Sequence, residues 1–581
     1  MTNMIQNAKD QAAALAMAAY KAAAADGTLP EAEVKTAPVE IPKDTANGDY
    51  TTTFALAAAK ALGKPPRVIA QALLDHMNLA GTYFTSAEIA GPGFLNFRLG
   101  DQWYAGVMNA VETEKDVYGT NDSLKGQKIM VEFVSANPTG PMHMGNARGG
   151  ALGDCLAAVL DFAGYDVSRE FYVNDAGNQI AKFGLSLDIR YQQLFLGEDA
   201  VQLPEDSYHG EDIIERAKEF AAVNGDKYMS ASEQERRQAL IDFALPKNIA
   251  AMKENMAKYR INYDTWFLES TLHNDGELEE TLNIMRDKGL TYEKDGALWY
   301  KNKEVLAAKL REQGKSEEEI ERLELKDEVL IRTNGNPTYF AADIAYHRNK
   351  LQIRGFDKAI DVWGADHHGH VARMKGALDA IGCNGDDLDI ILMQLVRLTR
   401  DGEVVRMSKR SGKAITLVDL LEEIPIDAVR FLFNMREPGS QMDFDLDLAV
   451  EQSSQNPVYY CQYAHARICS ILRKLASEGV EPRECTIPEL ALLTAPEEKE
   501  LIKHLSGLTD EIIASAKNYD PAKITRYAVE LATLFHKFYN ACRVGVEDES
   551  LMQARLSLCL CVRTVLRNVL TMFSISVPES M

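Results

Sequence analysis

The sequence predicts a multidomain α/β protein, in which a parallel sheet is joined to a smaller α/β unit and to an all-α unit. Residues 128–175 read as strand, loop, helix and strand, which is the pattern of a βαβ unit. Residues 448–581 are almost entirely of helical period. The chain has 581 residues, which is too long for one hydrophobic core. We therefore expect three or four domains.

The first unit, residues 1–115, is predicted to be a small α/β domain. It opens with an Ala-rich stretch that carries charged residues and is typical of an amphipathic helix rather than a secretion signal. Residues 48–63 and 66–77 are predicted helices, and residues 84–99 alternate in polarity around a Pro-Gly turn, as in a strand hairpin.

The second unit, residues 116–447, is predicted to form a Rossmann-like domain with a parallel sheet. Residues 185–328, approximately, are mostly of helical period and strongly charged, so we expect a helical insertion between two halves of the sheet. Ligands of such sheets bind at the carboxyl ends of the strands. Residues 448–581 are predicted to form an all-α bundle.

The amino-acid composition is that of a globular protein and not of a membrane protein. The chain is 46% hydrophobic and 26% charged, as in globular proteins, and no apolar run approaches the length of a membrane span. Its eight cysteines form no CxxC pair, which favours reduced thiols and a cytoplasmic protein over a disulfide framework or a zinc ribbon.

The net charge of −23, taken alone, argues against nucleic-acid binding. The charge is unevenly distributed, because residues 451–581 hold 14 Lys and Arg against 16 Asp and Glu. This part of the chain could present a basic face to a polyanion, although a solvated surface of mixed charge is the simpler interpretation.

The stretch HMGNARGG, His143–Gly150, lies where the first strand of the βαβ unit gives way to its helix. It lacks the GxGxxG pattern of dinucleotide-binding proteins. Backbone N–H groups at a helix start beside an imidazole suit a phosphate, and glycines let a flat base approach the main chain. A histidine that caps the helix or lies in the core is the alternative.

A second stretch, RMSKRSGK, spans Arg406–Lys413 and follows a predicted hairpin. Four cations on a glycine-containing loop would suit a clamp on a polyphosphate. An ammonium such as that of Lys409 would stabilise negative charge that builds on the phosphates in a transition state. A solvated basic turn is the alternative.

Together, these loops resemble the HIGH and KMSKS motifs of class I aminoacyl-tRNA synthetases. More closely, six ordered stretches resemble bacterial arginyl-tRNA synthetases: VEFVSANPTGPMHMGNARG, FYVNDAGNQI, TYFAADIAYH, VWGADHHGHVARM, VRMSKRSG and YCQYAHARI. The resemblance runs nearly end to end, and Gln553–Leu566 is similar to a helix of the family's DALR-type anticodon-binding domain.

The resemblance implies an arginine–tRNA ligase. Such an enzyme activates L-arginine with ATP to arginyl-adenylate, with Mg2+ on the leaving pyrophosphate. It then transfers the arginyl group to the 2′-hydroxyl of the terminal adenosine of tRNA-Arg, and it usually needs bound tRNA before it activates arginine. The resemblance also implies a tRNA-contacting N-terminal domain and a C-terminal anticodon-binding domain, and we expect a cytoplasmic monomer.

The resemblance also implies an arginine pocket. A guanidinium is a planar fork of donors that favours carboxylates. Asp343 with Tyr339 is expected at the guanidinium, and Ser135 with Asn137 at the substrate's ammonium and carboxylate groups. The arginine-binding residues are predicted to be Glu132, Ser135, Asn137, Tyr339, Asp343 and His367. The alternatives are a surface strand residue for Glu132 and a helix N-cap for Asp343.

The stretch DHHGH, Asp366–His370, invites a metal-site interpretation, but neighbouring histidines do not easily share one ion, and no metal site is predicted. By resemblance, this segment seats the adenosine, with Gly364 near the base and Asp366 at a ribose hydroxyl. His143 and Lys409 are the predicted catalytic residues. The predicted ATP-binding residues are His143, Gly145, Asn146, Gly364, Asp366, Met407, Ser408 and Lys409.

The C-terminal helices carry aromatic residues among cations, on which splayed anticodon bases could stack. The candidates are Tyr459, Tyr463, Arg467 and Phe538, with Tyr539 and Arg543 nearby. Helical aromatics more often belong to a core.

Three alternative functions stay open at this point: another class I synthetase such as a glutamyl or cysteinyl enzyme, a small-molecule nucleotidyltransferase, and a non-catalytic RNA-binding paralogue. The cysteinyl enzyme would want a zinc-thiolate pocket, and a nucleotidyltransferase would not need the helical C-terminus. Asn146 weakly favours the paralogue, because it departs from the second histidine of the family motif. An amide still donates a neutral hydrogen bond, and sister class I enzymes tolerate HxGN.

Overall fold

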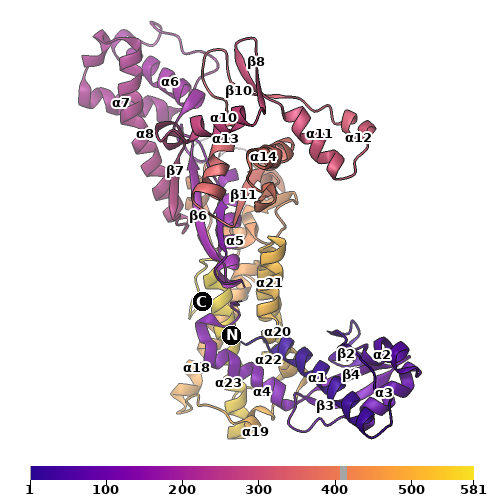
Figure 1. Ribbon diagram of the computed structural model, residues 1–581. Helices are drawn as coiled ribbons and strands as arrows, with labels where there is room; N and C mark the ends of the chain where they lie inside the picture. Colours follow the sequence, from indigo (N-terminus) through magenta and orange to yellow (C-terminus); the bar gives the residue numbers. More distant parts are fainter. Residues whose placement is uncertain (1, 123, 406–414) are drawn as a thin grey trace.

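The computed structural model describes residues 2–122, 124–405 and 415–581 (Figure 1). The N-terminal unit packs helices on an antiparallel sheet of strand order β1-β2-β4-β3. Its elements are α1 (Met4–Ala25), β1 (Val39–Glu40), β2 (Tyr50–Thr52), α2 (Phe54–Leu62), α3 (Pro66–Asp75), β3 (Phe84–Ala90) and β4 (Phe94–Leu99). The prediction of one helix over residues 48–63 is wrong at its start. Tyr50 and its two threonines favour a strand and pair with β4.

The central sheet is entirely parallel, with strand order β12-β11-β5-β6-β7. Its strands are β5 (Lys128–Glu132), β6 (Asp166–Val173), β7 (Thr265–Leu268), β11 (Lys358–Gly364) and β12 (Leu388–Met393). From β5 the chain builds outward first through β6 and β7, and later through β11 and β12 on the other side. The carboxyl end of β5 is therefore the switch point at which such sheets bind ligands.

Helix α5 (Gly145–Phe162) connects β5 to β6 and packs closely on the sheet. A Cβ atom on Gly153 would lie 2.1 Å from Cγ of Phe133, which directly follows β5. A glycine is therefore needed at this crossing. The close packing fixes the start of α5, and with it His143, beside the end of β5.

The insertion is less purely helical than predicted. It contributes the three-helix unit α6 (Gly177–Leu196), α7 (Glu211–Asn224) and α8 (Glu233–Lys258), with Phe183, Tyr191 and Phe220 in its core. After these helices the chain returns to the central sheet as β7, so this part of the predicted insertion belongs to the sheet. An antiparallel sheet then follows, built from β8 (Thr291–Lys294), β9 (Ala297–Tyr300) and β10 (Glu328–Ile331).

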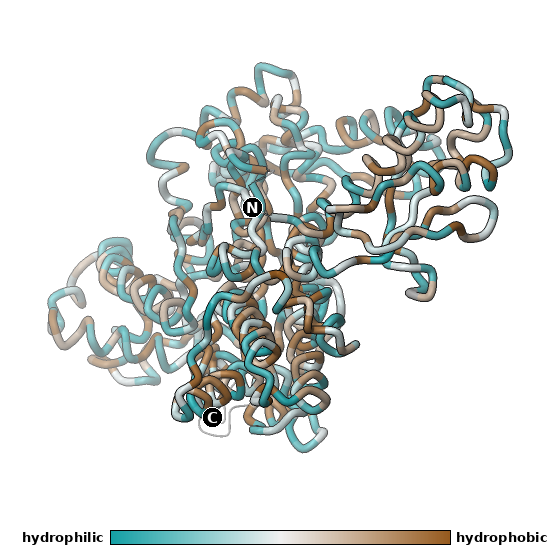
Figure 2. The backbone as a smooth tube through the Cα atoms, turned by 90° about the horizontal axis from the view of Figure 1, so that it is seen from below, coloured by the Kyte–Doolittle hydropathy of each residue, from teal (hydrophilic) through white to brown (hydrophobic). Residues whose placement is uncertain are grey.

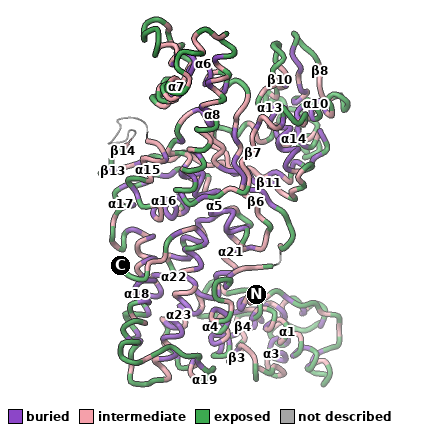
Figure 3. The backbone as a smooth tube through the Cα atoms, turned by 90° about the vertical axis from the view of Figure 1, so that its left-hand side faces the viewer, coloured by how far each residue is buried: buried purple, intermediate pink, exposed green. Residues whose placement is uncertain are grey.

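The C-terminal region is all-α, as predicted. Its main helices are α18 (Pro457–Ser477), α20 (Pro496–Ser506), α21 (Leu508–Asn518), α22 (Ala522–Ala541) and α23 (Glu549–Met572). Buried residues run through α22 and α23 in Figure 3, and Figure 2 shows hydrophobic and hydrophilic positions alternating along the helices. Within the described residues, no helix is long and apolar enough to cross a membrane.

One helix of the first 115 residues packs into this bundle. Helix α4 (Asp101–Glu114) lies against α20 and α23. Ser557 Oγ donates a hydrogen bond to Glu112 at 2.5 Å, and the hydroxyl of Tyr118 donates to the carbonyl oxygen of Leu505 at 3.0 Å. The N-terminal and C-terminal regions therefore share a packed interface.

Candidate active site

A cavity of about 590 Å3 opens at the carboxyl ends of β5 and β11. Glu132 ends β5, and Ser135 and Asn137 follow it. Helix α13 (Tyr339–Arg348) supplies a second wall, and the segment after β11 supplies a third. The lining includes all six residues predicted to bind arginine and two predicted to bind ATP: Glu132, Ser135, Asn137, Tyr339, Asp343, His367, Gly364 and Asp366. Sequence stretches more than 200 residues apart thus meet at the switch point of the sheet.

The backbone turns sharply after β5. Val134 and Ser135 have φ angles of 73° and 43°, which are left-handed conformations that residues other than glycine seldom adopt. Such strain persists where the surrounding structure enforces it, often at functional sites. The turn brings Ser135 Oγ back to donate a hydrogen bond to Glu132 Oε1 at 2.7 Å.

Helix α13 presents one face to the cavity. Its lining residues Tyr339, Asp343, Tyr346 and His347 follow the three- and four-residue spacing of a single helix face. Thr338 caps the helix, because its side chain accepts a hydrogen bond from the N–H of Ala341. The N-cap interpretation of Asp343 is therefore wrong, and Glu132, at 7% exposed, is not a surface strand residue.

The cavity also contains a carboxylate that is not among the residues predicted from the sequence. Glu269 directly follows β7, begins the short helix α9 (Glu269–Asn274) and is 4% exposed. It accepts a hydrogen bond from the hydroxyl of Tyr172 at 2.9 Å, and burial raises the pKa of its carboxyl group. Because burial disfavours the charged form, a cation bound beside Glu269 would restore it. An acidic residue at the end of a strand is the signal that the sequence offers, but the predicted helical insertion includes the residues of β7.

The carboxylates of the cavity differ in their partners. Glu132 forms an ion pair with the buried ammonium of Lys350, at 2.5 Å. In the described part of the chain, the ion-pair partners of Asp343 and Glu269 are histidines: His370 at 3.1 Å and His273 at 3.7 Å, respectively. Asp366, whose side chain is exposed, also has a histidine partner, so Asp343 and Glu269 are the less exposed acids of the cavity that lack a lysine or arginine partner within the described residues.

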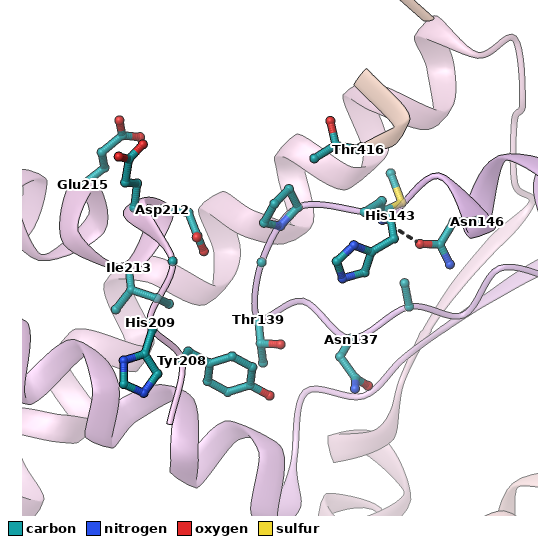
Figure 4. Close-up of a pocket in the computed structure, with 16 residues that line it drawn as sticks. Asn137, Thr139, His143, Asn146, Tyr208, His209, Asp212, Ile213, Glu215 and Thr416 are labelled. Atoms are coloured by element: carbon teal, nitrogen blue, oxygen red, sulfur yellow. Dashed lines mark hydrogen bonds between the residues drawn. The ribbon is translucent and has the colours of Figure 1, made fainter. Parts of the chain in front are cut away.

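A second cavity, of about 1060 Å3, adjoins the first through Asn137, which lines both (Figure 4). One wall carries His143 and Asn146, and the insertion supplies Tyr208 and Asp212 opposite. The dashed line in Figure 4 is the hydrogen bond that the backbone N–H of His143 donates to Asn146 Oδ1, at 2.9 Å. Asn146 therefore holds the histidine loop through its oxygen.

A third cavity, of about 360 Å3, is lined by His143, Gly145, Val405 and Ile415, among others. Met144 N–H donates to the Ile415 carbonyl oxygen at 3.2 Å, and Leu417 N–H donates to that of Met142 at 2.9 Å. The described residues on either side of the RMSK stretch, Val405 and Ile415, thus lie beside the histidine loop. Met407, Ser408 and Lys409 themselves lie outside the described residues.

The residues predicted to bind tRNA divide into two groups. On α18 the rings of Tyr459 and Tyr463 are stacked with centroids 6.3 Å apart, and the guanidinium of Arg467 lies 4.6 Å from the centre of the Tyr463 ring. These three residues are half-buried, so each keeps a face toward solvent. Phe538 is fully buried in the bundle core, so its prediction as a base-stacking residue is wrong. Helical period alone does not distinguish these two environments.

Comparisons with known proteins place the chain in a family. Three family models match the chain: "Arginyl tRNA synthetase N terminal domain" over residues 9–99, "tRNA synthetases class I (R), catalytic domain" over 107–468 and "DALR anticodon binding domain" over 461–581. The chain is 53% identical over 555 residues to an arginine–tRNA ligase of Ruminiclostridium cellulolyticum, covering 96% of this chain and 95% of that one.

Two further comparisons cover nearly the whole chain. It is 52% identical over 581 residues to an arginine–tRNA ligase of Acetivibrio thermocellus, covering 100% of both chains. Its fold is similar to that of the arginyl-tRNA synthetase of Thermus thermophilus, with a TM-score of 0.69 at 22% identity, covering 98% of this chain and 99% of that chain.

Proposed function

The chain belongs to the arginyl-tRNA synthetases, a class I family of aminoacyl-tRNA ligases, and from this membership we infer that it joins L-arginine to tRNA at the expense of ATP. We propose in addition which residues perform each part of the reaction. The pairing of the cavity's acids carries the proposal: Glu132 is occupied by Lys350, whereas Asp343 and Glu269 face the cavity with histidine partners.

The substrate guanidinium is proposed to lie between Asp343 and Glu269, with Tyr339 alongside. Two carboxylates can satisfy the planar donors of a guanidinium, whereas the single ammonium of lysine fills only part of such a site. Glu132, Ser135, Asn137 and His367 then surround the amino-acid end, near the boundary with the second cavity.

ATP is proposed to extend from the segment after β11 toward the start of α5. Gly364 would face the base and Asp366 a ribose hydroxyl. His143, Gly145 and Asn146 would contact the phosphates, since the helix start and the imidazole both favour an anion. Met407, Ser408 and Lys409 are proposed to contact the triphosphate, because Val405 and Ile415, the described residues on either side of their segment, line a cavity together with His143.

Mg2+ is proposed to accompany ATP, since phosphate oxygens and one or two carboxylates are its usual ligands. The carboxylates of Asp212 and Glu215 on the wall facing His143 are of this kind. The ion would neutralise charge on the leaving pyrophosphate. Chelation by EDTA should abolish activation and added Mg2+ should restore it, while full activity in EDTA would exclude the requirement.

In the proposed first step, the arginine carboxylate attacks the α-phosphorus of ATP in line, and pyrophosphate leaves. In the second, the 2′-hydroxyl of the terminal adenosine of tRNA-Arg attacks the arginyl carbonyl, and AMP leaves. The chain contributes mainly positioning and stabilisation of charge. The DALR-type domain is proposed to bind the anticodon, with Tyr459, Tyr463 and Arg467 on its exposed face, and the enzyme to act as a cytoplasmic monomer.

ATP–pyrophosphate exchange tests this function. Exchange should require arginine among the twenty amino acids and should increase when tRNA is added. Exchange driven by another amino acid would assign the chain to another specificity, and absence of exchange with tRNA present would favour the non-catalytic RNA-binding paralogue. Lys409→Ala should lower kcat much more than it weakens arginine binding. An unchanged kcat would exclude the transition-state role of Lys409.

A further inference from the structure

Three buried carboxylates lie side by side across the central sheet. Glu170 on β6, Glu132 on β5 and Asp361 on β11 are register partners, and they are 0%, 7% and 0% exposed. Neighbouring strands are about 4.8 Å apart, so three uncompensated charges here would strongly destabilise the sheet. Glu132 and Asp361 line the arginine cavity, whereas Glu170 is not among its lining residues in the described chain.

The lysine and arginine that pair with this row come from one turn of the chain, and His347 on α13 also contacts Asp361, at 2.7 Å. The residues after α13 form a π-helical segment, Asn349–Ile353, and Arg354 follows it. Arg354 makes a bidentate contact with Glu170, at 2.5 and 2.9 Å. The Lys350 ammonium, fully buried, lies 2.5 Å from Glu132 Oε2 and 2.8 Å from Asp361 Oδ1. Insertions of this π-helical kind occur frequently at functional sites.

Lys350 joins two walls of the cavity. It lies eleven residues after Tyr339, so it continues the helical face that carries Tyr339 and Asp343. Its ammonium also lies 4.3 Å from the centre of the Tyr346 ring. On the opposite side, Glu132 accepts the hydrogen bond of Ser135 Oγ, which in turn accepts one from the N–H of Tyr172 at 3.2 Å. Contacts therefore run from α13 through Lys350 and Glu132 to Ser135.

We propose that Lys350 is a positioning residue for arginine activation, acting through Glu132. By holding Glu132 and Asp361 on one ammonium group, it fixes Ser135 to receive the amino-acid end of the substrate. It also occupies Glu132, so that the guanidinium is drawn to Asp343 and Glu269. The inference rests on the proposed function, because it takes the cavity as the arginine site.

The first test compares two buried ion pairs from the same turn. Lys350→Met should raise the KM for arginine at least tenfold in tRNA-supported ATP–pyrophosphate exchange, with the KM for ATP within twofold of wild type. Arg354→Met, the matched control, also removes the cation of a buried carboxylate and should lower Tm, but should leave the KM for arginine within twofold. Equal increases in the KM for arginine in Lys350→Met and Arg354→Met would mean that these buried ion pairs matter only for folding, which would overturn the proposal.

A double-mutant cycle tests the route through Glu132. Lys350→Met leaves two buried carboxylates without their ammonium group, and Glu132→Gln removes one of these charges, while Asp361 keeps its contact with His347 at 2.7 Å. The double variant is therefore expected to fold even where Lys350→Met alone does not. Its KM for arginine should not exceed that of the worse Glu132→Gln or Lys350→Met single variant, because both changes break one chain of contacts. If the increases in the KM for arginine of the two single variants multiply in the double variant, Lys350 does not act through Glu132. A wild-type KM for arginine in Lys350→Met or in the double variant would exclude any role of Lys350 in positioning.

The wild-type enzyme in the same assay separates the two proposals. If the wild type catalyses exchange with arginine and Lys350→Met has the same KM for arginine, only the proposed role of Lys350 is overturned. A wild type that exchanges with a different amino acid would overturn the proposed function and with it the premise of this inference.

Discussion

Asn146 supports the histidine loop through an acceptor, which is the part of its side chain that a second histidine could also supply. Its Oδ1 receives the N–H of His143 at 2.9 Å, and the amide N–H groups remain available to the second cavity, which Asn146 lines. Asn146, which stands in place of the second motif histidine, therefore leaves the loop with a hydrogen-bond acceptor.

Two substitutions of Asn146 test whether its hydrogen-bond acceptor contributes to ATP binding. Asn146→Ala removes the acceptor and should raise the KM for ATP roughly fivefold or more, as expected for one lost hydrogen bond. Asn146→His retains an acceptor and should retain activity. Initial rates of exchange at varied ATP measure both variants. Equal activity of wild type and Asn146→Ala would mean that this side chain does nothing for ATP.

Asp343 offers the clearest test of charge recognition by one residue. Asp343→Asn keeps the size of the side chain but removes its charge, so the KM for arginine should rise roughly 10- to 100-fold, the range expected for a hydrogen bond to a charged group. The KM for ATP should stay nearly constant. Asp366→Asn is a useful counterpart, because its effect should fall on ATP. If Asp343→Asn leaves the KM for arginine unchanged, the guanidinium binds elsewhere.

Single residues also show how far the sequence could predict the site. The resemblance brought together six arginine-site residues that line one cavity, although it could not reveal that Lys350 already neutralises Glu132. That pairing depends on register between β5 and β11, which one sequence does not determine. Phe538 was mistaken for a surface residue because a helical aromatic fits either face.

Among the elements, α5 has the greatest influence on the site, because its packing on β5 places His143. Gly153→Ala would put Cβ 2.1 Å from Phe133 Cγ, an overlap that should destabilise the protein by about 1–3 kcal/mol and move the helix start. Gly149→Ala is the matched control in the same helix, since its Cβ would meet Met393 at an ordinary 3.6 Å. Thermal unfolding should show a lower Tm for Gly153→Ala alone, and unaltered Tm in both variants would contradict the close packing.

Elements with strong periodicity were predictable, and those defined by pairing were not. The βαβ unit and the C-terminal helices follow their hydrophobic patterns. The four-residue strand β7 lies between helices in a charged stretch, and only its pairing with β6 makes it a strand of the sheet. Because β7 was missed, Glu269 at its end was missed as well.

At the scale of the whole molecule, a chain of net charge −23 must bind a polyanion, so the binding surface has to be local. When Lys and Arg side chains contact phosphates, counterions are released from the nucleic acid. A protein with two or three such phosphate contacts therefore loses roughly tenfold in affinity when the salt concentration rises fourfold. The KM for tRNA should therefore rise about tenfold or more between 50 and 200 mM salt, while the KM for arginine changes little. A tRNA KM that is insensitive to salt would argue against phosphate contacts.

The most direct test of the arginine site is the attachment of three amino acids to tRNA-Arg under identical conditions. Citrulline has nearly the shape of arginine without its charge, and lysine has the charge without the planar fork. If Asp343 and Glu269 recognise both properties, arginine should be attached and the other two should react at least 1,000-fold more slowly, because a buried carboxylate would be left unpaired. Attachment of citrulline or lysine at a rate near that of arginine would contradict this recognition.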